Sequence, residues 1–235
     1  ALVLEGIAVV VHDVRGHGRT AEAAELGLGR VPSGPEGAVP RWAADLAELI
    51  AASRASMPST PVFLLGHSGG TVVSQYCVGK GLAKVDGMLL SAPPARVPAM
   101  QRPFLRALLG FLHKVHGTHG VSKIPAKVTF DKFQKNALAA AGGGPRDKLT
   151  GFEWLSRDAA EVDKYLADPY CGHDLSIGFW VSFNQVLNSL QDPATLAALP
   201  ADLPLCIFVG EHDFCSVDDS GVTSFTSVQR ELLKA

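Results

Sequence analysis

The chain has 235 residues, of which 47% are apolar and 19% charged, and its formal net charge is −2. This near-neutral balance argues against a nucleic-acid-binding protein, because such proteins need a basic face that displaces counterions from phosphates. No apolar run approaches the roughly 20 residues that a membrane-spanning helix needs. The length suits one large domain with a substantial hydrophobic core.

The cysteines and the two ends of the chain indicate its setting. The four cysteines are far apart and form no C-x-x-C pair: Cys77, Cys171, Cys206 and Cys215. We expect separate reduced thiols, with neither a disulfide framework nor a zinc site, and a cytoplasmic location. The sequence starts at Ala1 without a secretory signal and stops at Ala235 within a helical pattern, so we expect it to be cut short at both ends.

Four short apolar or β-branched runs predict buried strands, at residues 7–12, 62–65, 85–90 and 205–209. Each run is flanked by turn residues and is too short for a helix. Four apolar residues at helical spacing predict a helix between the first two strands: Trp42, Leu46, Leu49 and Ile50. Residues 71–79 predict a second helix. Alternating strands and helices predict an α/β protein with a mostly parallel sheet and helices on both faces.

The alternation breaks between residues 95 and 200, where only helical patterns and a glycine-rich linker at residues 142–145 occur. A long insertion between two buried strands is a natural place for a lid over an active site. We therefore predict a first part of the core at residues 1–94, a helical cap at 95–200 and a second part of the core at 201–235.

Residues 66–70 read Gly-His-Ser-Gly-Gly and match the motif G-x-S-x-G. In that motif a strand turns sharply into a helix and exposes the serine at the apex. Because a predicted strand leads in and a predicted helix leads out, we predict Ser68 as a nucleophile and the amide of Gly69 as an oxyanion donor. A β-carbon at either flanking glycine is expected to collide with the neighbouring strand or helix. The alternative is a plain turn rich in small residues.

A serine nucleophile needs a histidine to take its proton and a carboxylate to orient that histidine. In this type of site the chain order is Ser, then Asp or Glu, then His. We assign Asp213, which follows the last predicted strand, as the acid. Glu211, Asp218 and Asp219 compete for this role, and a solvated acidic loop is the alternative.

No histidine follows Asp213 in the sequence. His67 and His212 adjoin the predicted nucleophile and acid, but neighbouring side chains diverge at such turns. We expect the catalytic histidine to lie beyond Ala235, so that the chain by itself is a poor catalyst.

Three other histidines, His113, His116 and His119, have a spacing that could suggest a metal site. Gly117 and Gly120 interrupt the helix that would bring them together, so we predict no metal site there. A mechanism based on serine, histidine and aspartate needs neither a metal nor an organic cofactor.

Several motifs in the same order resemble the monoacylglycerol lipase and lysophospholipase family, also described as the serine aminopeptidase-type α/β hydrolases. They are the Asp-Val-Arg-Gly-His-Gly-Arg-Thr run at residues 13–20, the motif at 66–70 and Gly-Glu-His-Asp at 210–213. Cap segments at 154–158, 161–163 and 167–169 resemble bacterial members. The resemblance spans essentially the whole chain.

The resemblance implies an α/β-hydrolase fold, with Ser68 as nucleophile, Asp213 as acid and Gly69 as one oxyanion donor. It also implies that about three N-terminal strands and the catalytic histidine lie outside the sequence. Gly69 stands where many members have Met, and Phe214 stands where a proline usually follows the acid. Residues 13–20 are expected to be structural and to shape the sheet edge.

The start of the insertion is crowded with apolar residues: Phe104, Leu105, Leu108, Leu109, Phe111 and Leu112. Such a helix either packs on the core or forms a lid face that admits an acyl chain or touches a lipid surface. The resemblance favours a small-molecule ester or lipid as substrate, and we expect a transient contact with a membrane surface.

Two other functional classes compete with the esterase. Residues 16–21 match a dinucleotide-binding G-x-G-x-x-A pattern, but glycines and prolines follow where that fold needs a helix and a second strand. The other class is a binding protein that kept the α/β-hydrolase fold and lost the triad histidine. Among ester hydrolases and peptidases, the sequence leaves the substrate open.

Overall fold

The computed structural model describes residues 2–24, 26–31, 36–95, 97–140, 149–190, 192–196, 198–210 and 213. The core elements are η1 (Leu2–Glu5), α1 (Gly18–Glu22), α2 (Ala38–Ser56), β1 (Phe63–His67), α3 (Gly69–Gly79), β2 (Gly87–Ser91) and β3 (Leu205–Phe208). Between β2 and β3 lie α4 (Arg102–His116), α5 (Lys123–Ala140), α6 (Ala159–Ala167), α7 (Ile177–Leu190) and α8 (Pro193–Leu196).

The sheet has the order β1-β2-β3, and both pairs of neighbours are parallel. Leu65 lies opposite Leu89, which in turn lies opposite Cys206. Three of the four predicted strands are thereby confirmed, with bounds that differ by one or two residues. Because the strands are parallel, their carboxyl ends meet at one edge, where ligands bind in open α/β sheets.

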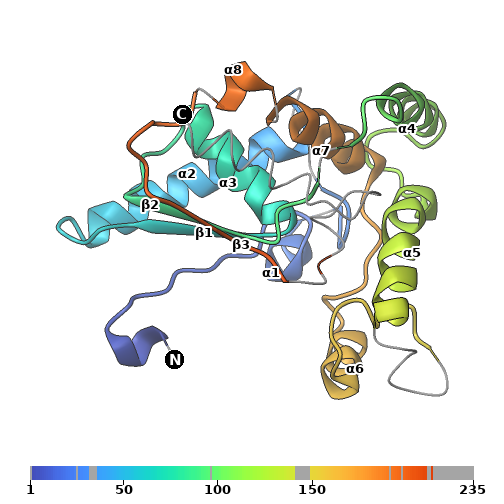
Figure 1. The fold of residues 1–235 in the computed structure, drawn as a ribbon, viewed down its shortest axis with the longest axis horizontal. Coiled ribbons are helices and arrows are strands. Elements are labelled where there is room, and N and C mark those ends of the chain that lie inside the picture. Colours follow the sequence, from blue (N-terminus) through green and yellow to red (C-terminus); the bar gives the residue numbers. More distant parts are fainter. Residues whose placement is uncertain are drawn as a thin grey trace.

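Helices α2 and α3 pack together along one face of the sheet (Figure 1). The predicted apolar face of α2 is buried at Trp42, Leu46 and Ile50, which join Val72 and Cys77 of α3 in the main core. A smaller cluster around Met88 and Leu90 fills the space between α3 and the strands. This face of the sheet therefore supplies the main part of the hydrophobic core.

The opposite face of the sheet is open to solvent at several apolar side chains. Phe63 and Leu65 of β1 and Cys206 and Phe208 of β3 are exposed. The register places them on one face, because paired residues in a parallel sheet project to the same side.

Residues 7–12 form no strand, which corrects the first of the four strand predictions. The segment is extended but is paired with no other described strand, and Ile7, Val9, Val10 and Val11 are exposed. The run of apolar, β-branched residues has the composition that a buried strand requires. A strand also needs a neighbour that accepts its backbone hydrogen bonds, and the described residues supply none here.

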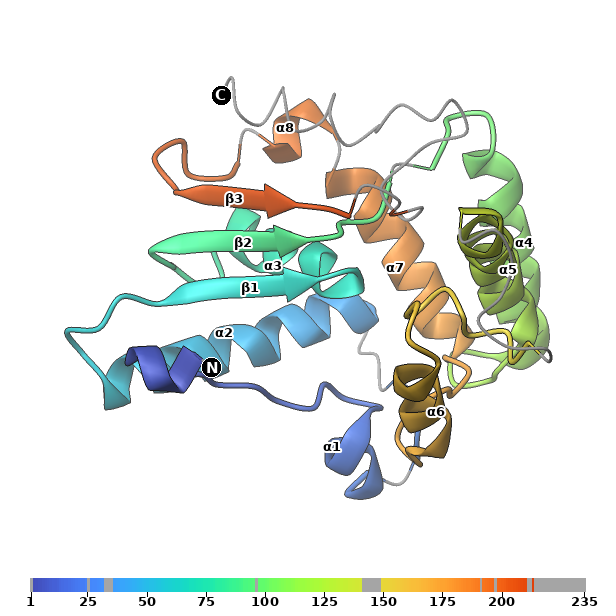
Figure 2. The ribbon, with the colours of Figure 1, turned by 60° about the horizontal axis from the view of Figure 1, so that its bottom comes forward.

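Among its described residues, the region predicted as a cap contains the helices α4 to α8 joined by turns and loops, and its only β-type pairing is an isolated bridge between Val121 and Ser176. Figure 2 shows α4, α5 and α6 at one end of the molecule, while α7 runs back toward α3. Helix α7 contacts α2, α3 and α4, so it joins the cap to the core. The predicted bounds of the cap stay a prediction.

No helix in the described part of the chain combines the length and the apolar character that spanning a bilayer requires.

Candidate active site

Ser68 occupies the turn between β1 and α3 with φ 49° and ψ −120°. A residue with a β-carbon adopts a positive φ at a cost, so the turn is strained at this residue. Two hydrogen bonds hold its carbonyl oxygen, from the amide of Thr71 at 2.9 Å and from the Thr71 hydroxyl at 2.6 Å. The side chain of Ser68 is partly exposed at the carboxyl edge of the sheet.

The first and last glycines of the motif, Gly66 and Gly70, differ in how much space surrounds them. A β-carbon at Gly66 would lie 2.7 Å from the Ser74 hydroxyl and 2.8 Å from the Gly70 carbonyl oxygen. Gly66 therefore allows β1 and α3 to approach each other closely. A β-carbon at Gly70 would meet nothing within 4 Å, so the predicted collision is wrong at that position.

Gly69 begins α3, and the first amides of a helix have no acceptor within the helix. Its amide therefore lies next to Ser68 at the positive end of the helix dipole. A β-carbon at Gly69 would lie 3.5 Å from the ring of Phe183, a residue of α7. The sequence did not single out Phe183, because its approach to the turn depends on how the cap returns to the core.

The edge of the sheet beside Ser68 is held by contacts from β2. The amide of Ser68 donates to the carbonyl oxygen of Ser91 at 2.9 Å. His67 lies with its Nδ1 3.0 Å from the Ser91 hydroxyl oxygen, so this ring nitrogen has a hydrogen-bond partner other than Ser68. Ala92, the next residue, also has a positive φ of 48°. Strained backbone at adjacent strand ends is common at functional sites.

Asp213 lies beyond β3, and its amide donates to the carbonyl oxygen of Gly210 at 3.0 Å. The amide of Ala92 donates to Phe208 at the end of β3, so the ends of all three strands are tied together. Ser68 and Asp213 therefore follow the carboxyl ends of β1 and β3 at the same edge of the sheet. The competing acids Glu211, Asp218 and Asp219 lie outside the described residues, and the role of Asp213 stays a prediction.

Three other described histidines have partners other than Ser68. His113 contacts the Thr118 hydroxyl, His173 contacts the Pro169 carbonyl oxygen, and His17 packs edge-on against Trp42. Helix α4 ends at His116, and Gly117 follows with φ 72°, as the interrupting glycines predicted. No group of three potential metal ligands occurs among the described residues. His212 lies outside them.

Residues 13–17 form a loop that leads into α1, which begins at Gly18. The Asp13 carboxylate accepts from the amide of Arg19, and Arg15 makes a paired ionic contact with Asp45 of α2, at 2.6 and 2.9 Å. Trp42 donates to the Arg15 carbonyl oxygen. These contacts fasten the loop to α2, and α1 has only five residues. The loop thus lacks the long helix that a dinucleotide-binding turn requires.

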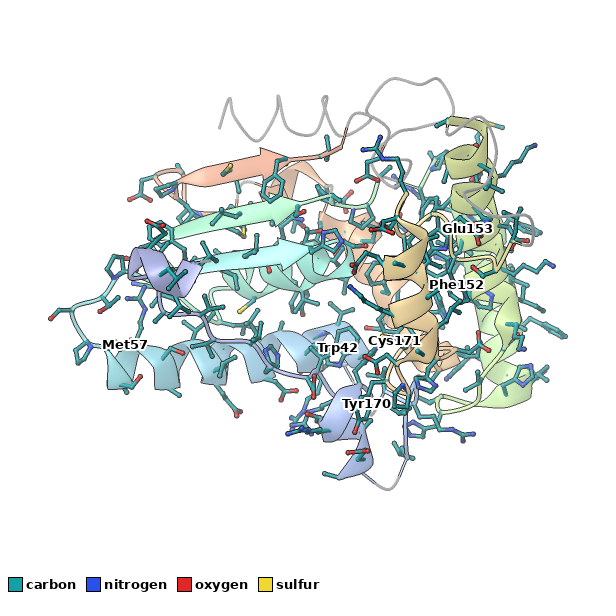
Figure 3. All side chains as sticks on the ribbon, turned by 90° about the horizontal axis from the view of Figure 1, so that it is seen from below. Trp42, Met57, Phe152, Glu153, Tyr170 and Cys171 are labelled. Atoms are coloured by element: carbon teal, nitrogen blue, oxygen red, sulfur yellow. The ribbon has the colours of Figure 1, made fainter. Side chains whose placement is uncertain are left out.

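A buried carboxylate stabilises the cap. Glu153, which Figure 3 labels beside Phe152, accepts hydrogen bonds from the amide and hydroxyl of Thr150, the amide of Gly151 and the side chain of Gln134 on α5. Burial alone would raise the pKa of Glu153, but these bonds favour the charged form and lower its pKa to about 2. The sequence carried no signal for this anchor.

Aromatic rings connect that anchor to the nucleophile turn. Trp154 stacks on Phe130 with ring centroids 4.9 Å apart, and Phe130 contacts Trp180 of α7. Trp180 contacts Phe179, which stacks on Phe183 at 5.4 Å. The cap therefore presents a packed apolar wall to the turn that carries Ser68.

Solved structures of hydrolases share this architecture. A highly thermostable carboxyl esterase from Bacillus coagulans in complex with glycerol superposes with a TM-score of 0.74 and 20% identity, covering 94% of this chain and 67% of that one. A lipase in an open form gives a TM-score of 0.76, 20% identity and the same coverages. A soluble variant of the Saccharomyces cerevisiae monoglyceride lipase, in complex with a substrate analog, gives 0.57 and 15%, covering 93% and 62%.

At these identities the likeness concerns the fold, and it confirms the predicted α/β-hydrolase class. A search of curated proteins found no match. The sequence model of the serine aminopeptidase S33 family matches residues 1–231, which is nearly the whole chain. The chain therefore belongs to the serine aminopeptidase S33 family of α/β hydrolases.

Proposed function

We propose that the protein is a serine hydrolase of carboxylic esters in which Ser68 is the nucleophile. One observation carries the proposal: Ser68 is held at a positive φ between β1 and α3, beside the first amide of that helix. A serine on such a turn exposes its hydroxyl, and the adjacent amide can donate to an oxyanion.

The proposed reaction has two stages. The Ser68 oxygen attacks the ester carbonyl carbon while a histidine takes the hydroxyl proton, and the Gly69 amide donates to the oxyanion. The carbonyl re-forms, the alcohol leaves with that proton, and water then hydrolyses the acyl-enzyme. Asp213 orients the histidine. Because no histidine occurs between Asp213 and Ala235, we propose that the 235-residue chain alone is a poor catalyst.

The proposed substrate is a small-molecule ester or lipid, of the lysophospholipase or monoacylglycerol lipase type. Phe183 supports an apolar substituent, because its ring lies next to the space that a side chain at Gly69 would fill. Structurally similar proteins are described as a carboxyl esterase, a lipase and a monoglyceride lipase. A transient contact with a membrane surface belongs to the same proposal. Cys77, Cys171 and Cys206 are free thiols, which supports a cytoplasmic location.

An alkyl fluorophosphonate tests the nucleophile, because it reacts with activated serines and needs no knowledge of the natural substrate. In a protein that includes the proposed histidine, we expect labelling, loss of labelling in Ser68→Ala, and retention of labelling in Ser56→Ala, whose hydroxyl lies on the exposed end of α2. Labelling that persists in Ser68→Ala would overturn the assignment.

The second candidate is a binding protein with an α/β-hydrolase fold and no catalysis. It is favoured by His17, His67, His113 and His173, because each of them has a hydrogen-bond partner other than the Ser68 hydroxyl. Absence of labelling in a folded protein that includes any segment following Ala235 would favour this candidate.

A further inference from the structure

Helix α4 presents two apolar faces, of which only one is covered. Leu109 and Leu112 are buried where α4 packs on α7. Phe104 and Phe111 are 74% and 64% exposed, and Val115 is also exposed. Spacings of seven and four residues place these three side chains in one line along the helix, about a third of a turn from the buried pair.

Helix α5 also exposes apolar side chains on its outer side. Phe130 and Phe133 face inward, where they contact Trp154. Ile124 and Val128, one turn apart, are exposed on the outer side. Both views of the ribbon place α4 and α5 together at the end of the molecule away from the N-terminal helix (Figures 1 and 2).

Positive charge is concentrated on the same two helices. Residues 97–140 contain seven Lys or Arg side chains and one acidic side chain, whereas the rest of the chain contains 14 basic and 22 acidic side chains. Six of the seven basic side chains are exposed: Arg106, Lys114, Lys123, Lys127, Lys132 and Lys135. The acidic one, Asp131, is 3.8 Å from Lys127.

Exposed aromatic side chains among basic ones suit a surface that binds to a membrane. Apolar side chains in line on a helix face gain free energy by entering the boundary between headgroups and acyl chains. Lysine and arginine next to them are attracted to anionic lipids. The excess of acidic residues elsewhere opposes contact of the remaining surface with the same membrane, so the charge distribution also sets the orientation.

We propose that the exposed faces of α4 and α5, here called the cap surface, dock on a lipid bilayer that contains anionic phospholipids. Phe104, Phe111 and Val115 enter the interface, and the six exposed basic side chains contact lipid headgroups. Because α4 packs on α7, and α7 carries Phe183 beside the Ser68 turn, docking brings the apolar wall of the site close to the lipid.

This inference deepens the membrane contact in the proposed function, but its test measures binding and not hydrolysis. The purified protein with Ser68→Ala is sedimented with vesicles of phosphatidylcholine alone and of phosphatidylcholine mixed with phosphatidylserine. We expect binding to the mixed vesicles to be at least about tenfold stronger, because several basic side chains each add to the attraction. Added salt should weaken that binding.

Two independent variants test the two parts of the cap surface. Phe104→Ser with Phe111→Ser should reduce binding to mixed vesicles by about tenfold or more, since each ring would lose its burial. Arg106→Gln with Lys114→Gln should reduce the preference for anionic vesicles by about tenfold. Matched controls outside the cap surface, Arg30→Gln with Arg157→Gln and Leu82→Ser, are exposed and should bind like the parent.

Equal binding to both kinds of vesicle would overturn the proposal, as would unchanged binding in both cap variants. A dimer that forms without lipid and dissociates in Phe104→Ser with Phe111→Ser would also overturn it, because a second copy would then cover the surface. Each of these results leaves fluorophosphonate labelling of the unaltered Ser68 as a separate measure of the proposed hydrolysis.

Discussion

The amide of Ser68 donates a hydrogen bond of 2.9 Å to the carbonyl oxygen of Ser91, and this bond ties the strained turn to the end of β2. Together with the two bonds from Thr71, it supports a backbone conformation that a residue with a β-carbon adopts only at a cost. The positive φ of Ser68 is therefore maintained by the sheet and the helix around it.

Ser68→Gly should stabilise the fold while it removes the hydroxyl. Glycine adopts this φ without strain, so we expect the free energy of unfolding to rise by about 1 kcal/mol, with loss of fluorophosphonate labelling. Urea unfolding of the variant and the parent measures the difference. A loss of stability would mean that the hydroxyl makes a structural contact.

The two flanking glycines should respond differently to alanine. Gly66→Ala places a methyl group 2.7 Å from the Ser74 oxygen, and we expect a loss of about 1–3 kcal/mol in the free energy of unfolding. Gly70→Ala lies in open space within α3, where alanine is expected to stabilise the helix by up to about 1 kcal/mol. Thermal unfolding of both variants tests this, and the opposite order would contradict the close approach of β1 and α3.

Glu153 should make the stability of the cap depend on pH. Its pKa in the folded protein, about 2, lies below the ordinary value of 4.5, so its charged form stabilises the folded state. This contribution is complete above pH 4.5 and is lost as the pH falls toward 2.

We expect Glu153→Gln to lower the free energy of unfolding by about 1–3 kcal/mol near neutral pH. The difference from the parent should shrink on acidification, as measured by urea unfolding at a series of pH values. Glu161→Gln is the matched control, because Glu161 is exposed and its carboxylate accepts a hydrogen bond of 2.6 Å from Lys164 on the same helix. If both substitutions change the free energy of unfolding equally, the buried hydrogen bonds of Glu153 do not add to the stability of the folded state.

The thiols should differ in reactivity. Cys77 is fully buried in the core, and burial raises the pKa of its thiol to about 11, whereas Cys206 is exposed on the open face of the sheet. Iodoacetamide reacts with thiolates, so Cys206 should be alkylated in the folded protein and Cys77 only after unfolding. Peptide mapping by mass spectrometry follows each residue. Protection of Cys206 would show that another part of the protein covers this face.

Phe183 should limit the substituents that the proposed active site accepts. Phe183→Ala should raise kcat/KM for bulky esters relative to short ones by about tenfold, since one apolar group in a pocket is worth about 1–3 kcal/mol. Gly69→Ala, whose methyl group would lie 3.5 Å from the same ring, should shift the ratio in the opposite direction. If the ratio of kcat/KM for bulky esters to that for short esters is the same in the parent and both variants, the acyl group does not bind next to Phe183.

Local chemistry in the sequence was sufficient to predict several elements of the structure. Residues 66–70 combine a β-rich run, a small-residue turn and a helix-compatible run, and the structure has β1, Ser68 and α3 in that order. The face of α2 that contains Trp42 was likewise predictable, because helical periodicity depends only on neighbours within a few residues.

Features that depend on distant partners were decided by the tertiary structure. Residues 7–12 have a strand-like sequence, yet they form no ladder because no described strand lies against them. The approach of Phe183 to Gly69 and the hydrogen bond between Gln134 and Glu153 join segments far apart in the chain. Such contacts depend on how α5 and α7 pack, and side-chain packing between distant elements leaves no local pattern in the sequence.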